Sequence, residues 1–347
     1  MKSQYTILVI LVLIVASSEA TAIDRVKRKD KGTVFGEITS MNNKEVTVSD
    51  RSTKTTIPVG RIKAIFYEDE PQELGRARAD VAQGRYEDAL RELGHIDKKK
   101  TLRKMVAADV EYLKAFSAAR LALRGKGPIR EAGSQMARFV EKHRDNYHWY
   151  EANRLVGDLL IANRQFAQAV HYFDTLAEAP WFDARLEAAV GKGRALLAEG
   201  KVDEAMASFT DALDMKPGRS DLKNPSIDKQ KMLAQIGLAR CLSEKGQPDK
   251  AVVQLRQILD KINPEDTQLA GQAYNALGSA LRKAGKPYDA LLAFLHVDVL
   301  YFASPQEHAE ALANLAQLWQ EVRKTDRAIQ AQEILRSRYP NSQWAKQ

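Results

Sequence analysis

Residues 186–217 read LEAAVGKGRALLAEGKVDEAMASFTDALDMKP and decide the fold predicted for this chain. Apolar residues recur there at three- and four-residue spacing in two runs, which is typical of two amphipathic helices. Gly200 lies between the runs, where a tight turn between helices requires a residue that tolerates a positive φ angle. Pro217 follows the second run and cannot continue a helix. The stretch therefore predicts a helical hairpin.

Small residues mark the place where the two helices of this hairpin cross. Gly193 lies on the first helix and Ala205 on the second, and helices that approach to 8–10 Å need small side chains at the closest point. The second-helix alanine recurs 36–46 positions apart, at Ala89, Ala132, Ala169, Ala205, Ala251, Ala290 and Ala328. The first-helix position is small at Ala77, Gly157, Gly193, Ala239, Gly278 and Ala316. The chain is therefore predicted to repeat one hairpin about seven times.

This pattern resembles the tetratricopeptide repeat, a helical hairpin of about 34 residues. The resemblance implies a mainly α fold in which hairpins over residues 70–345 stack into a right-handed solenoid. It is clearest at 186–217, 271–304 and 309–340, and weakest at 70–97 and 103–145.

The stretch 32–68 has a different period. Apolar residues alternate there, for example at Val46 and Val48, which favours strands. We expect three or four antiparallel strands in a small β module that resembles Sm-like or SH3-like domains. Asn42-Asn43 is a plausible hairpin turn, and Pro58 indicates an edge strand or a strand end. Such a small sheet is marginal alone, so we expect it to dock on the first helices.

The N-terminus predicts export. Ile7 to Ala16 is an unbroken apolar run, and Ala20 and Ala22 form the small-residue pattern of a signal-peptide cleavage site. We expect residues 1–22 to be a signal peptide that is cleaved after Ala22. The basic residues of 23–31, expected to be a mobile lead-in, could instead hold the segment as an uncleaved membrane anchor. The expected location is therefore periplasmic or extracellular.

Composition excludes several classes of protein. Hydrophobic residues make up 44 % and charged residues 28 % of 347 residues, which predicts a folded interior. The net charge of +8 is spread along the chain, so we expect a solvated surface and no nucleic-acid partner. The one cysteine, Cys241, cannot form an intramolecular disulfide and is expected to be a buried thiol.

No motif for catalysis or for a cofactor is present. The chain lacks the P-loop, the dinucleotide-binding glycine pattern, G-x-S-x-G and H-E-x-x-H. His143 and His148 are five positions apart and would point to different helix faces. We therefore predict no enzyme activity, and no catalytic, cofactor-binding or metal-ligating residues.

The resemblance instead implies a concave groove lined by the first helix of each hairpin. The residues that it would place in a partner-binding groove are Arg154, Asp158, Arg194, Arg240, Asn275, Ser279, Arg282 and Gln317. Arginines in such a stripe can bind carboxylates bidentately, so an acidic or C-terminal peptide is one hypothesis. A polar groove without a charge preference is the alternative.

Three other segments leave alternatives open. Residues 216–230 are either a solvated loop or a contact loop. Pro180-Trp181-Phe182 either packs between repeats or exposes two rings. No capping helix follows Pro340, so either the last helix is polar enough to face water or that end docks on a partner.

We predict a non-enzymatic scaffold of the cell envelope that binds a protein or peptide in the groove. The alternative is binding of an envelope polymer, a polyanion or a glycan, through the basic N-terminal segment and the β module. Contact with a membrane is expected only if the N-terminal segment stays uncleaved.

Overall fold

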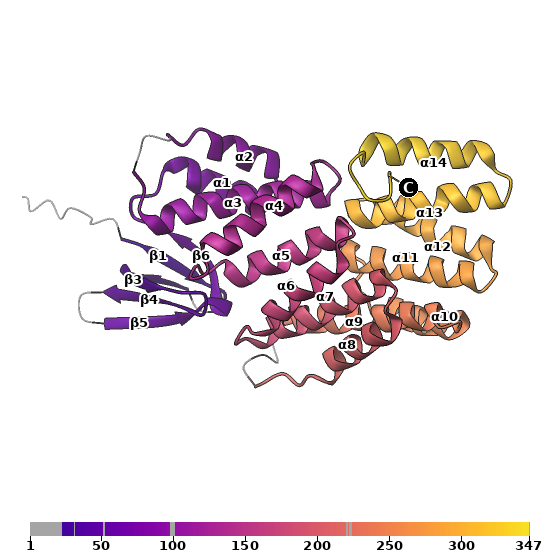
Figure 1. The fold of residues 1–347 in the computed structure, drawn as a ribbon, viewed down its shortest axis with the longest axis horizontal. Coiled ribbons are helices and arrows are strands. Elements are labelled where there is room, and N and C mark those ends of the chain that lie inside the picture. Colours follow the sequence, from indigo (N-terminus) through magenta and orange to yellow (C-terminus); the bar gives the residue numbers. More distant parts are fainter. Residues whose placement is uncertain are drawn as a thin grey trace, which may run out of the picture.

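The computed structural model describes residues 23–30, 32–50, 53–97, 101–219, 221 and 224–346. Within these ranges the chain forms a small β module followed by fourteen helices in seven antiparallel hairpins, stacked as a solenoid (Figure 1). The helices are α1 (Gln72–Ala82), α2 (Tyr86–Gly94), α3 (Lys104–Leu123), α4 (Ile129–Lys142), α5 (Trp149–Ala162), α6 (Phe166–Ala177), α7 (Phe182–Glu199), α8 (Val202–Asp214), α9 (Pro225–Glu244), α10 (Pro248–Leu259), α11 (Thr267–Lys283), α12 (Pro287–Leu300), α13 (Pro305–Glu321) and α14 (Thr325–Arg338).

Each hairpin turns through one residue with a positive φ angle. Gly200 has φ 89°, as the sequence predicted, and the turn positions of the seven hairpins are Gly84, Gly125, Arg164, Gly200, Gly246, Gly285 and Arg323. Left-handed backbone is easy for glycine and costs other residues roughly 1 kcal/mol. Arg164 and Arg323 are therefore exceptions that need a separate reason.

Glycines and phenylalanines interlock where consecutive hairpins meet. The ring of Phe173 lies against Gly157 of its own hairpin and Gly191 of the next, where an added Cβ would come within 2.7 Å and 2.3 Å of it. Phe209 lies in the same way between Gly193 and Gly237. The second-helix alanines Ala89, Ala132, Ala169, Ala205, Ala251, Ala290 and Ala328 are all buried, as are Ala77 and Ala239. Ala316, in the last hairpin, is only half-buried.

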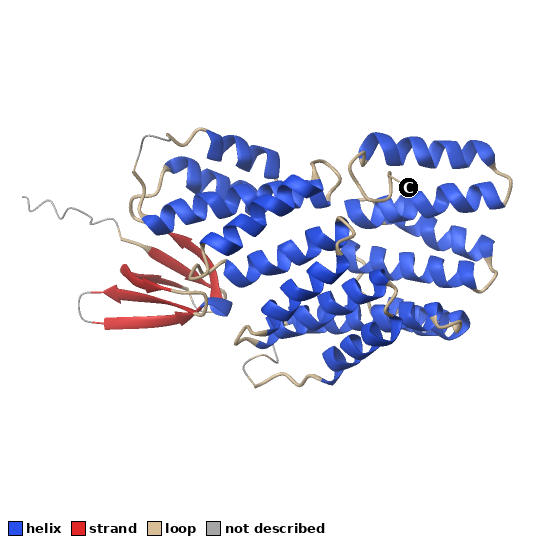
Figure 2. Ribbon diagram, in the orientation of Figure 1, coloured by secondary structure: helices blue, strands red, loops and turns tan. Residues whose placement is uncertain are grey.

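The β module contains two three-stranded antiparallel sheets (Figure 2). Their strands are β1 (Arg25–Arg28), β2 (Thr33–Phe35), β3 (Glu37–Met41), β4 (Glu45–Asp50), β5 (Thr53–Pro58) and β6 (Ile62–Phe66), with a short 3₁₀ helix, η1 (Val59–Arg61), before β6. The strand orders are β2-β1-β6 and β3-β4-β5. Pro58 ends the edge strand β5, as predicted, because a residue without an N–H cannot serve a central strand.

Two expectations about this region were wrong. Residues 25–28 do not belong to a mobile lead-in, because they form β1, the middle strand of its sheet. Val26 is fully buried opposite Val34 and Ile65, so alternate residues of the basic segment face the core. Five strands, not three or four, lie between positions 32 and 67. The expected signal peptide, residues 1–22, lies outside the described residues.

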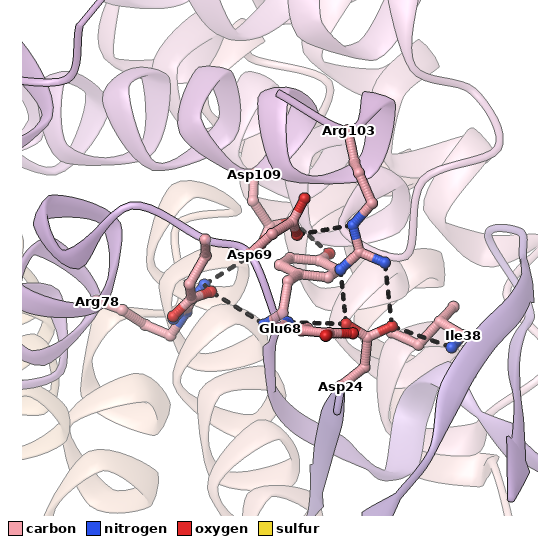
Figure 3. Close-up of polar contacts among 9 residues, drawn as sticks. Asp24, Ile38, Glu68, Asp69, Arg78, Arg103 and Asp109 are labelled. Atoms are coloured by element: carbon pink, nitrogen blue, oxygen red, sulfur yellow. Dashed lines mark hydrogen bonds and ion pairs between the residues drawn. The ribbon is translucent and has the colours of Figure 1, made fainter. Parts of the chain in front are cut away.

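A buried polar cluster fixes the β module to the first helices (Figure 3). The carboxylate of Asp24, 1 % exposed, accepts hydrogen bonds from the backbone N–H groups of Ile38 (3.0 Å) and Glu68 (2.9 Å). Arg103, just before α3, donates to the same carboxylate at 2.6 Å. Asp109 on α3 accepts from the hydroxyl of Tyr67, at the end of β6, at 3.2 Å. The module is thus part of the folded body, as expected.

The aromatic pair between the third and fourth hairpins also contacts the β module. Trp181 lies against Gly60 of η1 and meets the ring of Tyr150 edge-on at 5.3 Å, and Phe182 is buried. These rings pack between neighbours and are not exposed. In the described part of the chain, no helix combines the length and the apolar character needed to cross a bilayer.

Candidate functional site

The concave face of the solenoid forms an open cavity of about 670 Å³, which we call the lumen. The first helices of the second to seventh hairpins all contribute to its wall, that is α3, α5, α7, α9, α11 and α13. The segment 341–344 after α14 completes the wall opposite the α3–α4 turn. The lumen is therefore bounded by the second to seventh hairpins and by the C-terminal segment, and not only by the middle of the array.

A narrow contact closes the superhelix on itself. The backbone N–H of Asn341 donates to the carbonyl of Gly125, in the α3–α4 turn, at 3.3 Å. An added Cβ at Gly125 would lie 3.2 Å from Tyr339, so the two segments touch. The seventh hairpin thus returns to the second (Figure 1), and the residues beyond Pro340 pack against this chain's own second hairpin.

The last helix, α14, is polar on its outer side. Ala328, Ala331 and Leu335 are its buried residues, and most of the remaining positions are polar or charged and face water. Of the two alternatives for the C-terminal end, the structure therefore favours a last helix that itself caps the array.

Ion pairs line one side of the lumen. Arg154 on α5 donates to Asp158, one turn later, at 2.8 Å, and lies 3.4 Å from a carboxylate oxygen of Glu187 on α7. Arg194, also on α7, reaches the other oxygen of Asp158 at 3.1 Å. These arginines therefore already hold carboxylates of the chain itself, which reduces the charge that they offer to a ligand.

Another ion pair spans three hairpins. Arg240 on α9 donates to Glu310 on α13 at 3.1 Å, across the first helix of the hairpin between them. Glu307, one turn earlier on α13, accepts from the Gln272 amide at 2.9 Å. Burial raises the pKa of the Glu307 carboxyl above its ordinary value, although this hydrogen bond opposes the shift. The hydroxyl of Ser243 is buried without a hydrogen-bond partner among the described residues.

The lumen still carries more cations than acids. Its lining includes eight basic side chains, Arg120, Arg124, Arg154, Arg164, Arg194, Lys229, Arg240 and Lys283, and five acidic ones, Asp158, Glu187, Glu244, Glu307 and Glu310. Arg120 and Arg124 donate to neutral oxygens, the Tyr86 hydroxyl at 3.2 Å and the Gly84 carbonyl at 3.1 Å. Lys229 pairs with Asp266, just outside the lining, at 2.9 Å, so the cations exceed all these acids by two. This excess favours carboxylates at this surface.

The predicted groove residues fall into two groups. Arg154, Asp158, Arg194, Arg240 and Ser279 line the lumen. The other three do not. Asn275 on α11 is fully buried and donates to the Glu307 carbonyl on α13 at 2.8 Å. Arg282 on α11 donates to the side-chain oxygen of Gln317 on α13 at 2.9 Å, so these two residues are engaged with each other.

Sequence reasoning missed the cations at the closing end of the lumen. Arg120 and Arg124 come from the second hairpin, where the resemblance was among the weakest, and Arg164 occupies a turn position that is glycine in five of the seven hairpins. An arginine at this turn position could not have identified Arg164 alone, because Arg323 occupies the same position in the seventh hairpin and does not line the lumen. Among the residues described, no group of three or more histidine, cysteine or acidic side chains is arranged to hold a metal ion.

Comparisons with known proteins agree with this architecture. Residues 156–220 match the family model described as tetratricopeptide repeat. A Rap protein complexed with Competence and Sporulation Factor shares the fold with a TM-score of 0.56 at 13 % identity, over 79 % of this chain and 76 % of that one. A tetratricopeptide repeat protein from Parabacteroides merdae gives a TM-score of 0.51 at 16 % identity, over 79 % and 96 %. The search of curated proteins finds no match.

Proposed function

Because this chain carries tetratricopeptide repeats and folds as their solenoid, we propose that it is a non-enzymatic scaffold that binds a carboxylate-bearing peptide segment in the lumen. The segment is either acidic in its side chains or presents its own C-terminus. The solved Rap protein of the same fold is complexed with Competence and Sporulation Factor, and a protein or peptide partner is the kind proposed here.

The observation that carries the proposal is the unbalanced charge of the lumen. Its eight cations exceed its five acids by three, and by two once Asp266, which pairs with Lys229 at 2.9 Å, is counted. Guanidinium groups hold carboxylates through two parallel hydrogen bonds. A peptide carboxylate is the ligand that this excess favours.

The position of Arg164 supports a binding role for its side chain. Its φ angle is 61°, at a turn position that is glycine in five of the seven hairpins, and a left-handed arginine there costs roughly 1 kcal/mol. Arg323 has the same strained backbone away from the lumen, so the strain by itself marks no binding residue. What distinguishes Arg164 is that it lines the lumen, where its side chain is placed to contact the ligand.

The test uses variants that separate stability from binding. We expect Arg164→Gly to raise the midpoint of thermal unfolding and to weaken binding of a Glu-rich decapeptide about tenfold. Arg323→Gly is the matched control, because Arg323 has φ 59° at the corresponding turn position of the seventh hairpin but does not line the lumen. It should stabilise the fold equally and leave binding unchanged.

The peptides themselves provide the second control. Fluorescence anisotropy with Glu-rich, neutral and Lys-rich decapeptides, each with a free or an amidated C-terminus, should rank the acidic and free-acid forms first. Equal binding of acidic and basic peptides would contradict the proposal, and so would unchanged binding by both Arg164→Gly and Arg240→Glu.

We further propose that the scaffold works outside the cytoplasm, in the cell envelope. The support is the apolar run from Ile7 to Ala16 followed by the small residues Ala20 and Ala22. Cleavage after Ala22 would leave every described residue in place, including the buried Asp24. N-terminal sequencing of the protein from fractionated cells should find Ile23 first, and a cytoplasmic protein that begins at Met1 would contradict this location.

A further inference from the structure

The outer face of α12 carries a continuous apolar seam. Tyr288, Leu292, Leu295 and Val299 follow one another at spacings of four, three and four residues, and they lie within an arc of about 60° around the helix. Tyr288 is 69 % exposed, Leu292 59 % and Val299 62 %, and Phe302 just beyond the helix is 53 % exposed. Leu295 is half-buried and also packs against this chain's own core. Alternating spacings of three and four are the pattern by which one helix packs along another.

The rest of the array shows that repeat packing does not require this seam. Helix α12 packs inward through the opposite face, with Ala290, Phe294 and Val297 completely buried. In other second helices, the positions that correspond to the seam, counted from the buried alanine, are mainly polar. They are Asp203, Ala207, Thr210 and Asp214 in α8, and Asp326, Gln330, Glu333 and Ser337 in α14.

We propose that this seam binds a second copy of the same chain, with the two α12 helices antiparallel about a two-fold axis. The seam is self-complementary in that arrangement. An axis between Ala293 and Phe294 places Leu292 opposite Leu295 of the second copy and Tyr288 opposite Val299 of the second copy. A two-fold interface requires this reciprocal matching.

The flanking charges agree with the antiparallel arrangement. Asp289 and His296 lie on the same edge of the seam, two helical turns apart. The two-fold brings each Asp289 to within about 3 Å, along the helix axis, of the level of His296 in the second copy. An acid then faces an imidazole across the interface, and two acids do not face each other there.

The same residues argue against a lipid surface as the occupant. Pro287–Leu300 contains no lysine or arginine, and its charged residues are Asp289 and Asp298. Helices that lie on membranes carry basic residues beside their apolar face, which attract anionic lipids. The exposed apolar side chains amount to an area on the order of 500 Å², below the roughly 800 Å² per partner of a standard interface. We therefore expect a dimer that dissociates on dilution.

Sedimentation velocity of the protein, purified in the N-terminal form that cells produce, tests the proposal. Between roughly 1 and 100 µM the protein should shift from monomer to dimer. Leu292→Glu and Val299→Glu should each weaken the dimer more than about tenfold, because two apolar contacts per dimer are lost. Ile329→Glu, on α14 and also half exposed, is the matched control and should dimerise normally.

Cross-linking supplies a second measurement on the same seam. Leu292→Cys lies close to the proposed axis and should form a covalent dimer with a short bis-maleimide, whereas Ile329→Cys should not. The native Cys241 does not interfere, because it is fully buried. A monomer at all concentrations, or a dimer that both seam variants leave intact, would overturn the proposal. Binding of monomers to anionic vesicles that Leu292→Glu abolishes would overturn it too, in favour of a lipid occupant.

Discussion

Replacing Asp24 by asparagine should release the β module from the solenoid. The carboxylate is buried and joins three parts of the chain, the backbone of Ile38, the backbone of Glu68 and the guanidinium of Arg103 (Figure 3). An asparagine keeps the size of the side chain but replaces one acceptor oxygen by a donor NH₂ group. One of the two backbone N–H groups then faces another donor.

The magnitude follows from these contacts. A buried donor left without an acceptor costs about 1–3 kcal/mol. The lost charge on the bond to Arg103 adds about 1 kcal/mol, a reduced figure because the Arg103 side chain is 33 % exposed and water screens it. The sum is about 2–4 kcal/mol, which corresponds to roughly 30- to 1,000-fold faster exchange of amide hydrogens that open with the module.

Hydrogen exchange measured by mass spectrometry can detect this change locally. Peptides covering β1 and β3 should lose protection in Asp24→Asn, while those covering α11 to α14 should not, because these helices form the sixth and seventh hairpins, at the other end of the array from the β module (Figure 1). Asp30→Asn is the matched control, since Asp30 follows the same strand but pairs with Arg28 at the surface. Less than threefold faster exchange in β1 would refute the reasoning.

Acid should remove the difference in stability between the wild-type protein and Asp24→Asn. Burial raises the pKa of the Asp24 carboxyl, but the hydrogen bonds from Arg103, Glu68 and Ile38 outweigh burial and hold this pKa below its ordinary value of 3.8. The folded state therefore gains stability from the ionised carboxylate above about pH 4 and loses that gain as pH falls through the lower folded-state pKa. Wild type and Asp24→Asn should converge as the pH falls below 4.

Two further predictions concern the packing between repeats. Gly191→Ala should lower the free energy of unfolding, measured by thermal or denaturant melts, by at least about 1–3 kcal/mol, because the new Cβ would lie 2.3 Å from the ring of Phe173. Gly94→Ala is the control and should not destabilise the protein, because no atom lies within 4 Å of its added Cβ. Cys241 should resist thiol reagents at pH 8 in the folded protein and react on unfolding, because the side chain is buried and burial raises the pKa of its thiol to about 11. Rapid labelling of the native protein would contradict the position of Cys241 in the core.

The regular parts of the fold could be predicted from the sequence because they depend on local patterns. Residue size and spacing within about 40 positions predict the turns, the helix crossings and the seven hairpins. Gly200 was predicted to form a turn and has φ 89°, and Ala205 was predicted at a helix crossing and is fully buried. The strand Arg25–Arg28 was missed because only Val26 of its four residues is apolar. Its place in the middle of a sheet depends on pairing with Thr33–Phe35 and Ile62–Phe66.

The candidate site was predicted less completely because it depends on contacts between distant hairpins. The resemblance to the tetratricopeptide repeat placed Arg154, Arg194 and Arg240 on the concave side, but it could not show that each already pairs with an acid. The Arg240 pair joins residues 70 positions apart. The closure at Gly125 depends on the accumulated rotation of all the repeats, and no single repeat encodes that quantity.

The contacts of Asn341 and Tyr339 with Gly125 tie the seventh hairpin to the second. If the lumen binds a peptide as proposed, this junction affects how the peptide enters. A peptide with a free end can enter while the junction stays intact, whereas a loop held between two folded domains can thread through only if the junction opens. The proposed function therefore predicts that weakening the junction changes the binding of internal loops more than the binding of free peptide ends.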